Sequence, residues 1–177
     1  GDGANDPLVF YGALHVPEGE GPPLPVVVKY VLGPYGAEAH RASAALGATP
    51  PLRAIVPGFP GGEWCLVVMD RVEGLVDISE VQRTDPVRAS RAESALAHWA
   101  DAFHAQGFVH GDLRPGNVKL RPDGSPVILD FDWAGELGKA RYPSFMNHVD
   151  IEWPEGAKDG ELITADHDAE WISRLFH

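Results

Sequence analysis

The alternation of hydrophobic and polar positions predicts a strand-rich first part of the chain. Residues 8–16 and the β-branched run 26–32 flank a loop rich in Gly, Pro and Glu, which predicts a hairpin with a long loop. Residues 52–56 and 64–69 predict two further strands on either side of a turn rich in Gly and Pro. The alanine-rich segment 37–46 between the two pairs is typical of a helix that ends at a glycine.

The second part of the chain opens with the longest predicted helix. Asp85 is a favourable N-cap and Pro86 a favourable first-turn residue. The helix then presents one apolar face at helical spacing, which consists of Ala92, Leu96, Trp99 and Phe103. Gly107 is expected to end this helix.

Two short strands and a final helix follow. Residues 118–120 and 127–129 predict strands, and the Pro-Asp-Gly sequence at 122–124 predicts the turn between them. Near the C-terminus, the Asp-His-Asp sequence at 166–168 opens a helix that continues through Phe176. Acidic residues at a helix N-terminus are stabilised by the helix dipole, and a metal site is the alternative explanation.

The periodic pattern breaks between Asp70 and Gly74, where we expect a hinge between two lobes. A β-rich lobe with one helix is expected over residues 1–70, and a helical lobe over residues 71–177. This division places the chain in the α+β class. A length of 177 residues is enough for two small lobes that share a cleft, or for one compact domain.

The composition is that of a soluble globular protein with an acidic surface. Hydrophobic residues make up 44% of the chain and charged residues 23%. The formal net charge of -12 argues against nonspecific nucleic-acid binding, because phosphate backbones require Lys and Arg partners. Solubility is the ordinary explanation of this charge, and the alternative is a site for metal ions, a basic peptide or a polyamine-like substrate.

Cysteine content and hydropathy indicate an intracellular protein, cytoplasmic or nuclear. Cys65 is the single cysteine and lies in the apolar run 64–69, so we expect it to fill space in the core. No apolar stretch has the length of a membrane span, and no basic block is present to attract an anionic membrane. The first residues, Gly1 to Ala4, do not resemble a signal peptide.

A group of polar residues after the long helix carries the candidate chemistry. The loop His110-Gly111-Asp112-Leu113-Arg114-Pro115-Gly116-Asn117 precedes the two short strands, and Asp130-Phe131-Asp132 follows them. Phosphoryl transfer needs a positioned acceptor hydroxyl and cations that neutralise the β- and γ-phosphates. Asp112 can orient that hydroxyl and accept its proton, while Asn117 and Asp130 offer the oxygen ligands that Mg²⁺ prefers.

Two neighbours of these residues have expected supporting roles. We expect His110 to stabilise the loop by packing and hydrogen bonding rather than to act as a base. Asp132 is expected to be a structural cap, with a second metal ligand as the alternative.

The two motifs resemble the catalytic loop and the metal-binding motif of protein kinases and of their small-molecule relatives. The resemblance extends over most of the chain, from about the second strand onward. It implies a two-lobed protein kinase-like fold, with a β-rich N-lobe and a reduced helical C-lobe, that binds ATP and Mg²⁺. In this comparison Arg114 stands where a lysine usually neutralises the γ-phosphate, and Asp168 or Asp166 braces the catalytic loop.

The resemblance also assigns residues of the first part to nucleotide binding. Lys29 lies within an apolar strand, where a charge must be paired or functional. The matching lysine of kinases contacts the α- and β-phosphates and pairs with a glutamate on the next helix, for which Glu38 is the candidate. The alternative is that Lys29 extends from an edge strand and Glu38 is a solvated helix residue. Residues Met69, Asp70 and Arg71 would form the hinge whose backbone contacts adenine.

Three features depart from the kinase pattern. Gly12 and Gly19-Glu20-Gly21 lack the spacing of a glycine-rich phosphate loop, so that loop lies upstream of Gly1 or is absent. The catalytic loop reads His-Gly-Asp rather than His-Arg-Asp, a form common in aminoglycoside and choline kinase relatives. No Ala-Pro-Glu motif is present, and the chain leaves no room for the helices that usually complete the C-lobe.

The segment after the metal-binding motif is similar to that of fungal kinase-like proteins and of Crinkler-type kinase domains. The similarity lies in residues 133–136, 142–143 and 151–154. For an effector of this type, it implies delivery into a host cell.

The resemblance implies transfer of the γ-phosphate of Mg·ATP to a hydroxyl, most simply on Ser or Thr of a protein. The acidic charge and the His-Gly-Asp sequence suit a second possibility, a small cationic acceptor. A catalytically silent scaffold that acts by protein binding is the third possibility, and the missing phosphate loop favours it. Lys29, Asp112, Asn117 and Asp130 together argue against it.

Overall fold

The structure is a computed structural model that describes residues 8–15 and 21–177. The expectations for Gly1 to Ala4 and for Gly19 lie outside the described residues. The chain forms two compact units, which are described separately. The first comprises residues 1–35 and 50–73, and the second comprises residues 36–49 and 74–177.

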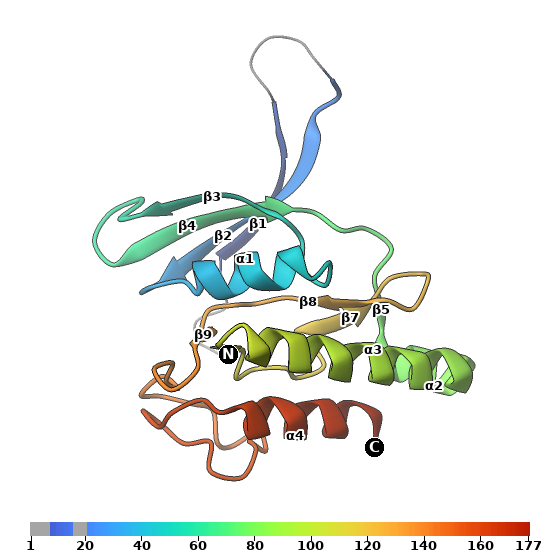
Figure 1. The fold of residues 1–177 in the computed structure, drawn as a ribbon. Helices are drawn as coiled ribbons and strands as arrows, with labels where there is room; N and C mark the ends of the chain where they lie inside the picture. Colours follow the sequence, from blue (N-terminus) through green and yellow to red (C-terminus); the bar gives the residue numbers. More distant parts are fainter. Residues whose placement is uncertain (1–7, 16–20) are drawn as a thin grey trace. The chain divides into compact units, whose positions relative to one another are not determined.

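The first unit is built on a four-stranded antiparallel sheet in the order β1-β2-β4-β3 (Figure 1). Its strands are β1 (Leu8–Leu14), β2 (Leu24–Leu32), β3 (Leu52–Pro57) and β4 (Trp64–Asp70). All four strands and the first hairpin were predicted from the hydrophobic pattern, and these predictions are confirmed. Cys65 packs with Val31, Val67 and Met69 in the buried core of this unit, which confirms its predicted role.

The second unit combines helices with short strands (Figure 1). Its helices are α1 (Ala37–Ala45), α2 (Ile78–Thr84), α3 (Pro86–Ala105) and α4 (Ala165–Phe176). Its strands are β5 (Val76–Asp77), β6 (Phe108–Val109), β7 (Val118–Leu120), β8 (Pro126–Ile128) and β9 (Gly135–Glu136). Strands β5, β7 and β8 form one sheet, and β6 pairs with β9.

Helix α3 is the central helix of the second unit and follows its sequence prediction closely. The Asp85 side chain caps it by accepting a hydrogen bond from the Arg88 N–H at 3.0 Å. The predicted apolar face is buried at all four of its positions, Ala92, Leu96, Trp99 and Phe103. Helix α3 contacts α2, α4, β6 and β8 of the same unit.

A buried polar network joins helix α1 to the rest of the second unit. The Trp99 Nε1–H donates to Ser43 Oγ at 3.0 Å, and that hydroxyl is 2.5 Å from Thr49 Oγ1. A backbone bond from Ile128 N to Ala48 O, at 2.7 Å, ties the end of the helical segment to β8. This helix was expected in the lobe of residues 1–70, whereas its contacts place it in the second unit.

Candidate active site

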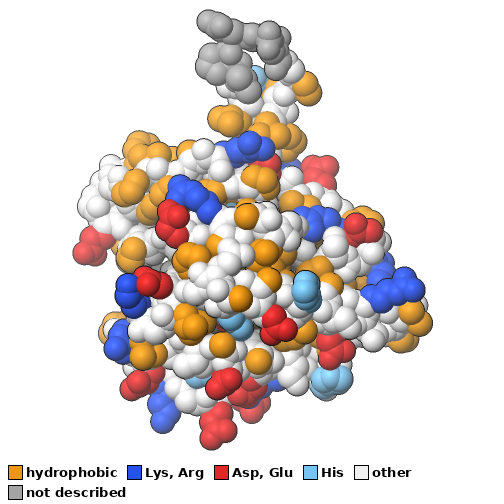
Figure 2. Space-filling model, in the orientation of Figure 1, with side chains coloured by type: hydrophobic (Ala, Val, Ile, Leu, Met, Phe, Trp, Pro, Cys, Tyr) orange, Lys and Arg blue, Asp and Glu red, His pale blue; other side chains and the backbone are white. Residues whose placement is uncertain are grey.

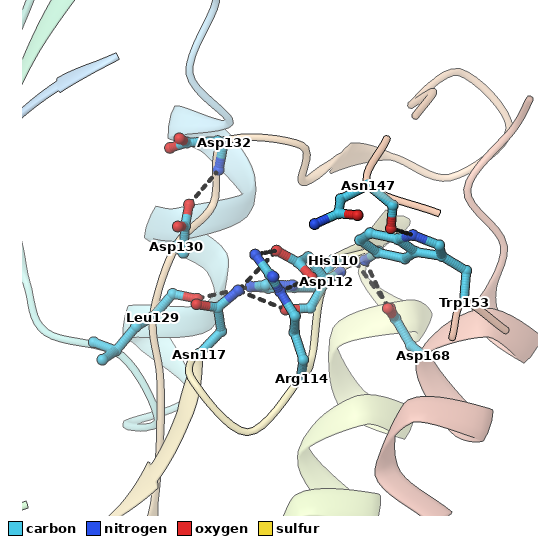
Figure 3. A network of polar contacts seen from close by, with 11 residues as sticks. His110, Asp112, Arg114, Asn117, Leu129, Asp130, Asp132, Asn147, Trp153 and Asp168 are labelled. Atoms are coloured by element: carbon cyan, nitrogen blue, oxygen red, sulfur yellow. Dashed lines mark hydrogen bonds and ion pairs between the residues drawn. The ribbon is translucent and has the colours of Figure 1, made fainter. Parts of the chain in front are cut away.

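The catalytic loop, residues 110–117, connects β6 to β7, and Asp130 follows β8 (Figure 3). Because β7 and β8 are antiparallel neighbours, the start of one strand and the end of the other lie side by side. The backbone bond from Leu129 N to Asn117 O, at 2.8 Å, fixes this juncture. The second unit thus brings the loop and the Asp130 segment together.

A buried carboxylate holds the first part of the catalytic loop. Asp168, in the first turn of α4, is fully buried. Its oxygens accept hydrogen bonds from the backbone N–H groups of His110 at 2.9 Å and Gly111 at 2.7 Å. A third bond joins it to His104 Nε2 at 3.0 Å. The expectation that Asp168 or Asp166 braces this loop is therefore confirmed for Asp168.

Helix α4 begins at Ala165, one residue before the Asp-His-Asp sequence that was expected to open it. Thr164 is its N-cap, and its hydroxyl accepts from the His167 N–H while the His167 ring accepts from the Thr164 N–H. With the cap supplied by Thr164, the carboxylate of Asp168 remains available to the loop. Among the described residues, no cluster of His, Cys, Asp and Glu supports the alternative of a metal site here.

His110 stabilises the loop by packing and hydrogen bonding, as expected from the sequence. Its Nδ1 accepts the N–H of Asp112 at 3.2 Å, so Nε2 carries the proton and donates to Leu129 O at 3.1 Å. The ring is fully buried and lies 4.8 Å from the Phe131 ring, which also contacts His40 of α1 at 4.8 Å. These contacts leave the imidazole no free nitrogen for proton transfer.

The glycine in the His-Gly-Asp sequence is required by two features of the structure. Gly111 has a φ of 83°, a conformation that residues with a Cβ adopt only with strain. A Cβ at this position would also lie 2.7 Å from Cδ1 of Ile163. An arginine, as in the protein kinase form of the motif, does not fit this backbone.

Asp112 is held in place by two neighbours on the same loop (Figure 3). Arg114 makes a two-pronged contact with its carboxylate, Nε to Oδ1 at 2.8 Å and an Nη to Oδ2 at 3.2 Å. The amide nitrogen of Asn117 donates to Oδ2 at 2.8 Å and to the Asp112 backbone carbonyl at 2.9 Å. Burial raises the pKa of Asp112 above its usual range, and the nearby charge of Arg114 opposes this effect.

Asn117 and Asp130 fit the requirements of a Mg²⁺ ion that arrives with a nucleotide. The nitrogen of the Asn117 amide is committed to Asp112, so its oxygen is the atom suited to a metal. The negative charge of Asp130 is near enough to contribute to the raised pKa of Asp112. Mg²⁺ takes only one or two protein ligands in such sites and completes its shell with phosphate and water oxygens.

The backbone at Asp130 is strained, which is characteristic of a functional position. Its φ of 64° is the only positive value among the non-glycine residues that the structure describes. Hydrogen bonds to the residues before and after Asp130 hold this conformation. His110 donates to Leu129 O, and Gly36 N donates to Phe131 O at 3.1 Å. The N–H of Asp132 bonds weakly to Asp130 Oδ1, at 3.4 Å.

The first unit contains the other nucleotide-binding candidates. Lys29 is only 5% exposed and lies on β2, an inner strand between β1 and β4. The alternative that it extends from an edge strand is therefore wrong. Met69 is buried, and Asp70 accepts two bonds from the Arg53 guanidinium at 2.5 and 2.6 Å. The Arg71 N–H donates to Pro25 O at 3.0 Å.

Glu38 belongs to the second unit and faces solvent. Its side chain is 76% exposed and pairs with Arg41, one turn further along α1, at 2.5 Å. The pairing of Glu38 with Lys29 stays a prediction.

An aromatic group beside Arg114 was not anticipated from the sequence. The rings of Trp133, Tyr142 and Trp153 lie 5.4 to 6.1 Å apart, and the Arg114 guanidinium lies 6.0 Å from the Trp153 ring. Burial raises the pKa of Tyr142, so its hydroxyl stays protonated and donates to His167 Nδ1 at 3.1 Å. These residues are separated by loops of irregular sequence, and only the unusual number of tryptophans after Asp132 could have indicated them.

The sequence from residue 31 to residue 136 matches the Phosphotransferase enzyme family, APH. The match covers more than half of the 177 residues and includes the catalytic loop and Asp130. The chain belongs to this family. The matched region ends just after the Asp130-Phe131-Asp132 segment, so the aromatic group extends beyond it.

A solved structure supports the same conclusion for the fold of this phosphotransferase-family protein. The Cydia pomonella granulovirus kinase PK-1 superposes with a TM-score of 0.55 at 19% identity, over 70% of this chain and 47% of that kinase. The protein therefore has an α+β protein kinase-like fold.

Curated relatives of this phosphotransferase-family protein are serine/threonine-protein kinases. PkaA of Streptomyces coelicolor is 33% identical over 107 residues, which are 55% of this chain and 20% of that kinase. WAG2 of Arabidopsis thaliana is 47% identical over 47 residues, which are 27% of this chain and 9% of that kinase. The chain thus spans a fifth or less of the length of these two relatives.

Within residues 8–15 and 21–177, no helix is both long enough and apolar enough to cross a bilayer.

Proposed function

We propose that this member of the phosphotransferase family transfers the γ-phosphate of Mg·ATP to the hydroxyl of Ser or Thr in a protein. The observation that carries the proposal is the buried Asp112 carboxylate, which Arg114 and Asn117 hold in one orientation. The serine/threonine-protein kinases among its relatives favour a protein acceptor.

In this proposal Asp112 orients the acceptor hydroxyl and accepts its proton. Its raised pKa brings it closer to the range in which a carboxylate is an effective base. Arg114 keeps the carboxylate ionised and, as the nucleotide reacts, neutralises charge on the γ-phosphate. Asp168 has a positioning role, because it acts through the backbone of the loop.

Two groups of residues are proposed to bind the nucleotide. Asn117 and Asp130 would hold Mg²⁺, which supplies positive charge to the β- and γ-phosphates. Lys29 is proposed to contact the α- and β-phosphates with Glu38 as its partner, and the backbone of Met69, Asp70 and Arg71 to contact adenine. Asp132 is assigned a structural role next to Asp130.

A small cationic acceptor is the second candidate function. The His-Gly-Asp sequence and the net charge of -12 favour it. A silent scaffold is the third, and it predicts no transfer at all. Location in the cytoplasm or nucleus, and delivery to a host cell as for Crinkler-type proteins, stay predictions from the sequence.

The test is label transfer from γ-labelled ATP to a mixture of basic proteins. Asp112→Asn should lower the transfer rate by a factor of about 10² or more while nucleotide binding stays nearly intact, because the base is lost and the metal ligands remain. Asp101→Asn, an exposed change on α3, is the matched control and should leave the rate unchanged. Equal rates for the parent and Asp112→Asn would exclude the catalytic assignment.

A further inference from the structure

Trp153 is a buried aromatic residue whose ring lies beside the catalytic loop (Figure 3). The Arg114 guanidinium lies 6.0 Å from the centre of this ring, at the outer end of the range of a cation–π contact. The same guanidinium holds the Asp112 carboxylate through its Nε and one Nη. Trp153 is therefore separated from the proposed base by one intervening side chain.

The orientation of the Trp153 indole is fixed by its surroundings. Its Nε1–H donates to the backbone carbonyl of Asn147 at 2.8 Å. Three further rings lie 5.4 to 6.1 Å from it, within the range of aromatic pairs, and they belong to Trp133, Tyr142 and Trp171. Because these contacts come from separate segments of the chain, the indole has little freedom to turn.

Helix α4 holds both Trp153 and the catalytic loop. Arg174, in the last turn of the helix, donates to the backbone carbonyl of Glu152 at 2.6 Å and to that of Trp153 at 3.5 Å. Asp168, in the first turn, accepts the two backbone hydrogen bonds from the loop. Since one helix carries both side chains, the spacing between the indole and the loop is set by a rigid element.

Arg114 is exposed enough for this contact to matter. Its side chain is 38% exposed, and holding an exposed arginine in one conformation costs side-chain entropy. The net charge is -12, and Figure 2 shows acidic side chains along the lower edge of this face, where Figure 1 places α4 and the loops before it. Other carboxylates would attract a mobile guanidinium. An aromatic ring against the guanidinium restricts its movement and consumes none of its N–H groups.

We propose that Trp153 is a positioning residue for phosphoryl transfer and acts through Arg114. Its ring keeps the guanidinium in the two-pronged contact with Asp112, so that the remaining N–H groups are available to the transferring phosphate. The inference rests on the proposed phosphotransfer and adds a residue from outside the two motifs. It also gives a reason for arginine rather than lysine at position 114. A planar guanidinium can lie against a ring and bind a carboxylate by two bonds, whereas an ammonium is a point charge.

The experiment measures label transfer from γ-labelled ATP to the mixture of basic proteins, per molecule that binds Mg·ATP. Trp153→Leu removes the ring and should lower the maximal rate about fivefold. The KM for ATP should stay unchanged, because Arg114 acts on charge that develops in the transition state. Trp153→Phe keeps a ring beside Arg114 and should restore most of the rate. If Trp153→Leu does not fold, Trp153→Met replaces it, since methionine adapts to irregular space.

A double-mutant cycle separates positioning from packing. In the Arg114→Met background, Trp153→Leu should change the rate by less than about twofold, because the group that the ring holds is gone. Trp133→Leu removes another ring of the aromatic group. It should lower the stability of the chain but keep the rate within about twofold of the parent.

The failure of this inference can be told apart from the failure of the proposed function. Equal falls on Trp153→Leu in the parent and in the Arg114→Met background would overturn the positioning role. An equal fall in Trp133→Leu would also overturn it, since the effect would then belong to the packing of the aromatic group. A parent that transfers no label would overturn the proposed function, and the role of Trp153 with it.

Discussion

Gly111 shows how closely a single residue in the site is determined by its neighbours. Its positive φ turns the chain so that two successive N–H groups, those of His110 and Gly111, point at the Asp168 carboxylate. The side chain of Ile163 occupies the space that any Cβ would need. The sequence identified the glycine as a departure from the protein kinase motif, but it could not supply the reason, because Ile163 lies far away along the chain.

Gly111→Ala should therefore lower the free energy of unfolding by about 2 kcal/mol, from the left-handed backbone alone and before any clash with Ile163. Urea denaturation measures this change. Gly116→Ala is the matched control on the same loop, since no atom lies within 4 Å of its added Cβ, and its φ is not in the left-handed region. If both variants were equally stable, the steric account of Gly111 would be wrong.

Arg114→Met should move the acid limb of the pH–rate profile to higher pH by about one unit. Asp112 must be ionised to act as a base, so activity is lost as the pH falls through its pKa. Burial already raises this pKa, and loss of the Arg114 charge removes the effect that opposes it. The profile of kcat/KM against pH for a protein acceptor is the measurement. Arg91→Met, an exposed change on α3, should leave the profile in place.

At the scale of elements, long periodic segments were predictable, whereas of the short strands in the second unit only β7 and β8, which a Pro-Asp-Gly turn separates, were predicted. Helix α3 and strands β2 and β4 carry enough apolar repeats to be recognised from the sequence alone. Helix α2 has only seven residues and strand β5 two, so neither shows a full period, and both were missed. The element against which α1 packs could not be predicted from the sequence either. The position of α1 depends on a hydrogen bond between Ser43 and Trp99, which are 56 residues apart.

Ser43→Ala tests this junction of α1 and α3. The substitution leaves the buried Trp99 N–H without its acceptor, so the free energy of unfolding should fall by about 1–2 kcal/mol. Thermal or urea unfolding followed by tryptophan fluorescence provides the measurement. Ser94→Ala, in the exposed part of α3, should change stability by less than about 0.5 kcal/mol. A fall of equal size in both variants would show that the buried network contributes nothing specific.

At the scale of the whole molecule, the protein kinase-like fold followed from two short motifs. The catalytic loop and the Asp130 segment were both recognisable because their spacing is local. The aromatic group at Trp153 was not, since its contacts depend on irregular segments with no periodic pattern. Residues in local motifs were thus easier to predict than residues whose contacts join irregular segments.

Mg·ATP should raise the melting temperature of the whole chain, because a ligand that binds only the folded state stabilises it. At a ligand concentration of 100 Kd, the gain is about 2.7 kcal/mol. Asp130→Asn should remove most of the rise in melting temperature that depends on Mg²⁺. The rise that ATP produces in the presence of EDTA should remain. Asp101→Asn should behave as the parent. An unchanged melting temperature at saturating Mg·ATP would contradict the nucleotide site as a whole.

The attachment of α1 to the second unit has a consequence for the synthesis of the protein. A ribosome releases α1 before β3 and β4, yet the groups that hold it, Trp99, Ile128 and Phe131, leave the ribosome much later. Helix α1, which lies between β2 and β3 in the sequence, must therefore wait for partners from the second half of the chain. Fragments truncated near residue 71 would carry an unattached α1, and we expect them to be captured by chaperones.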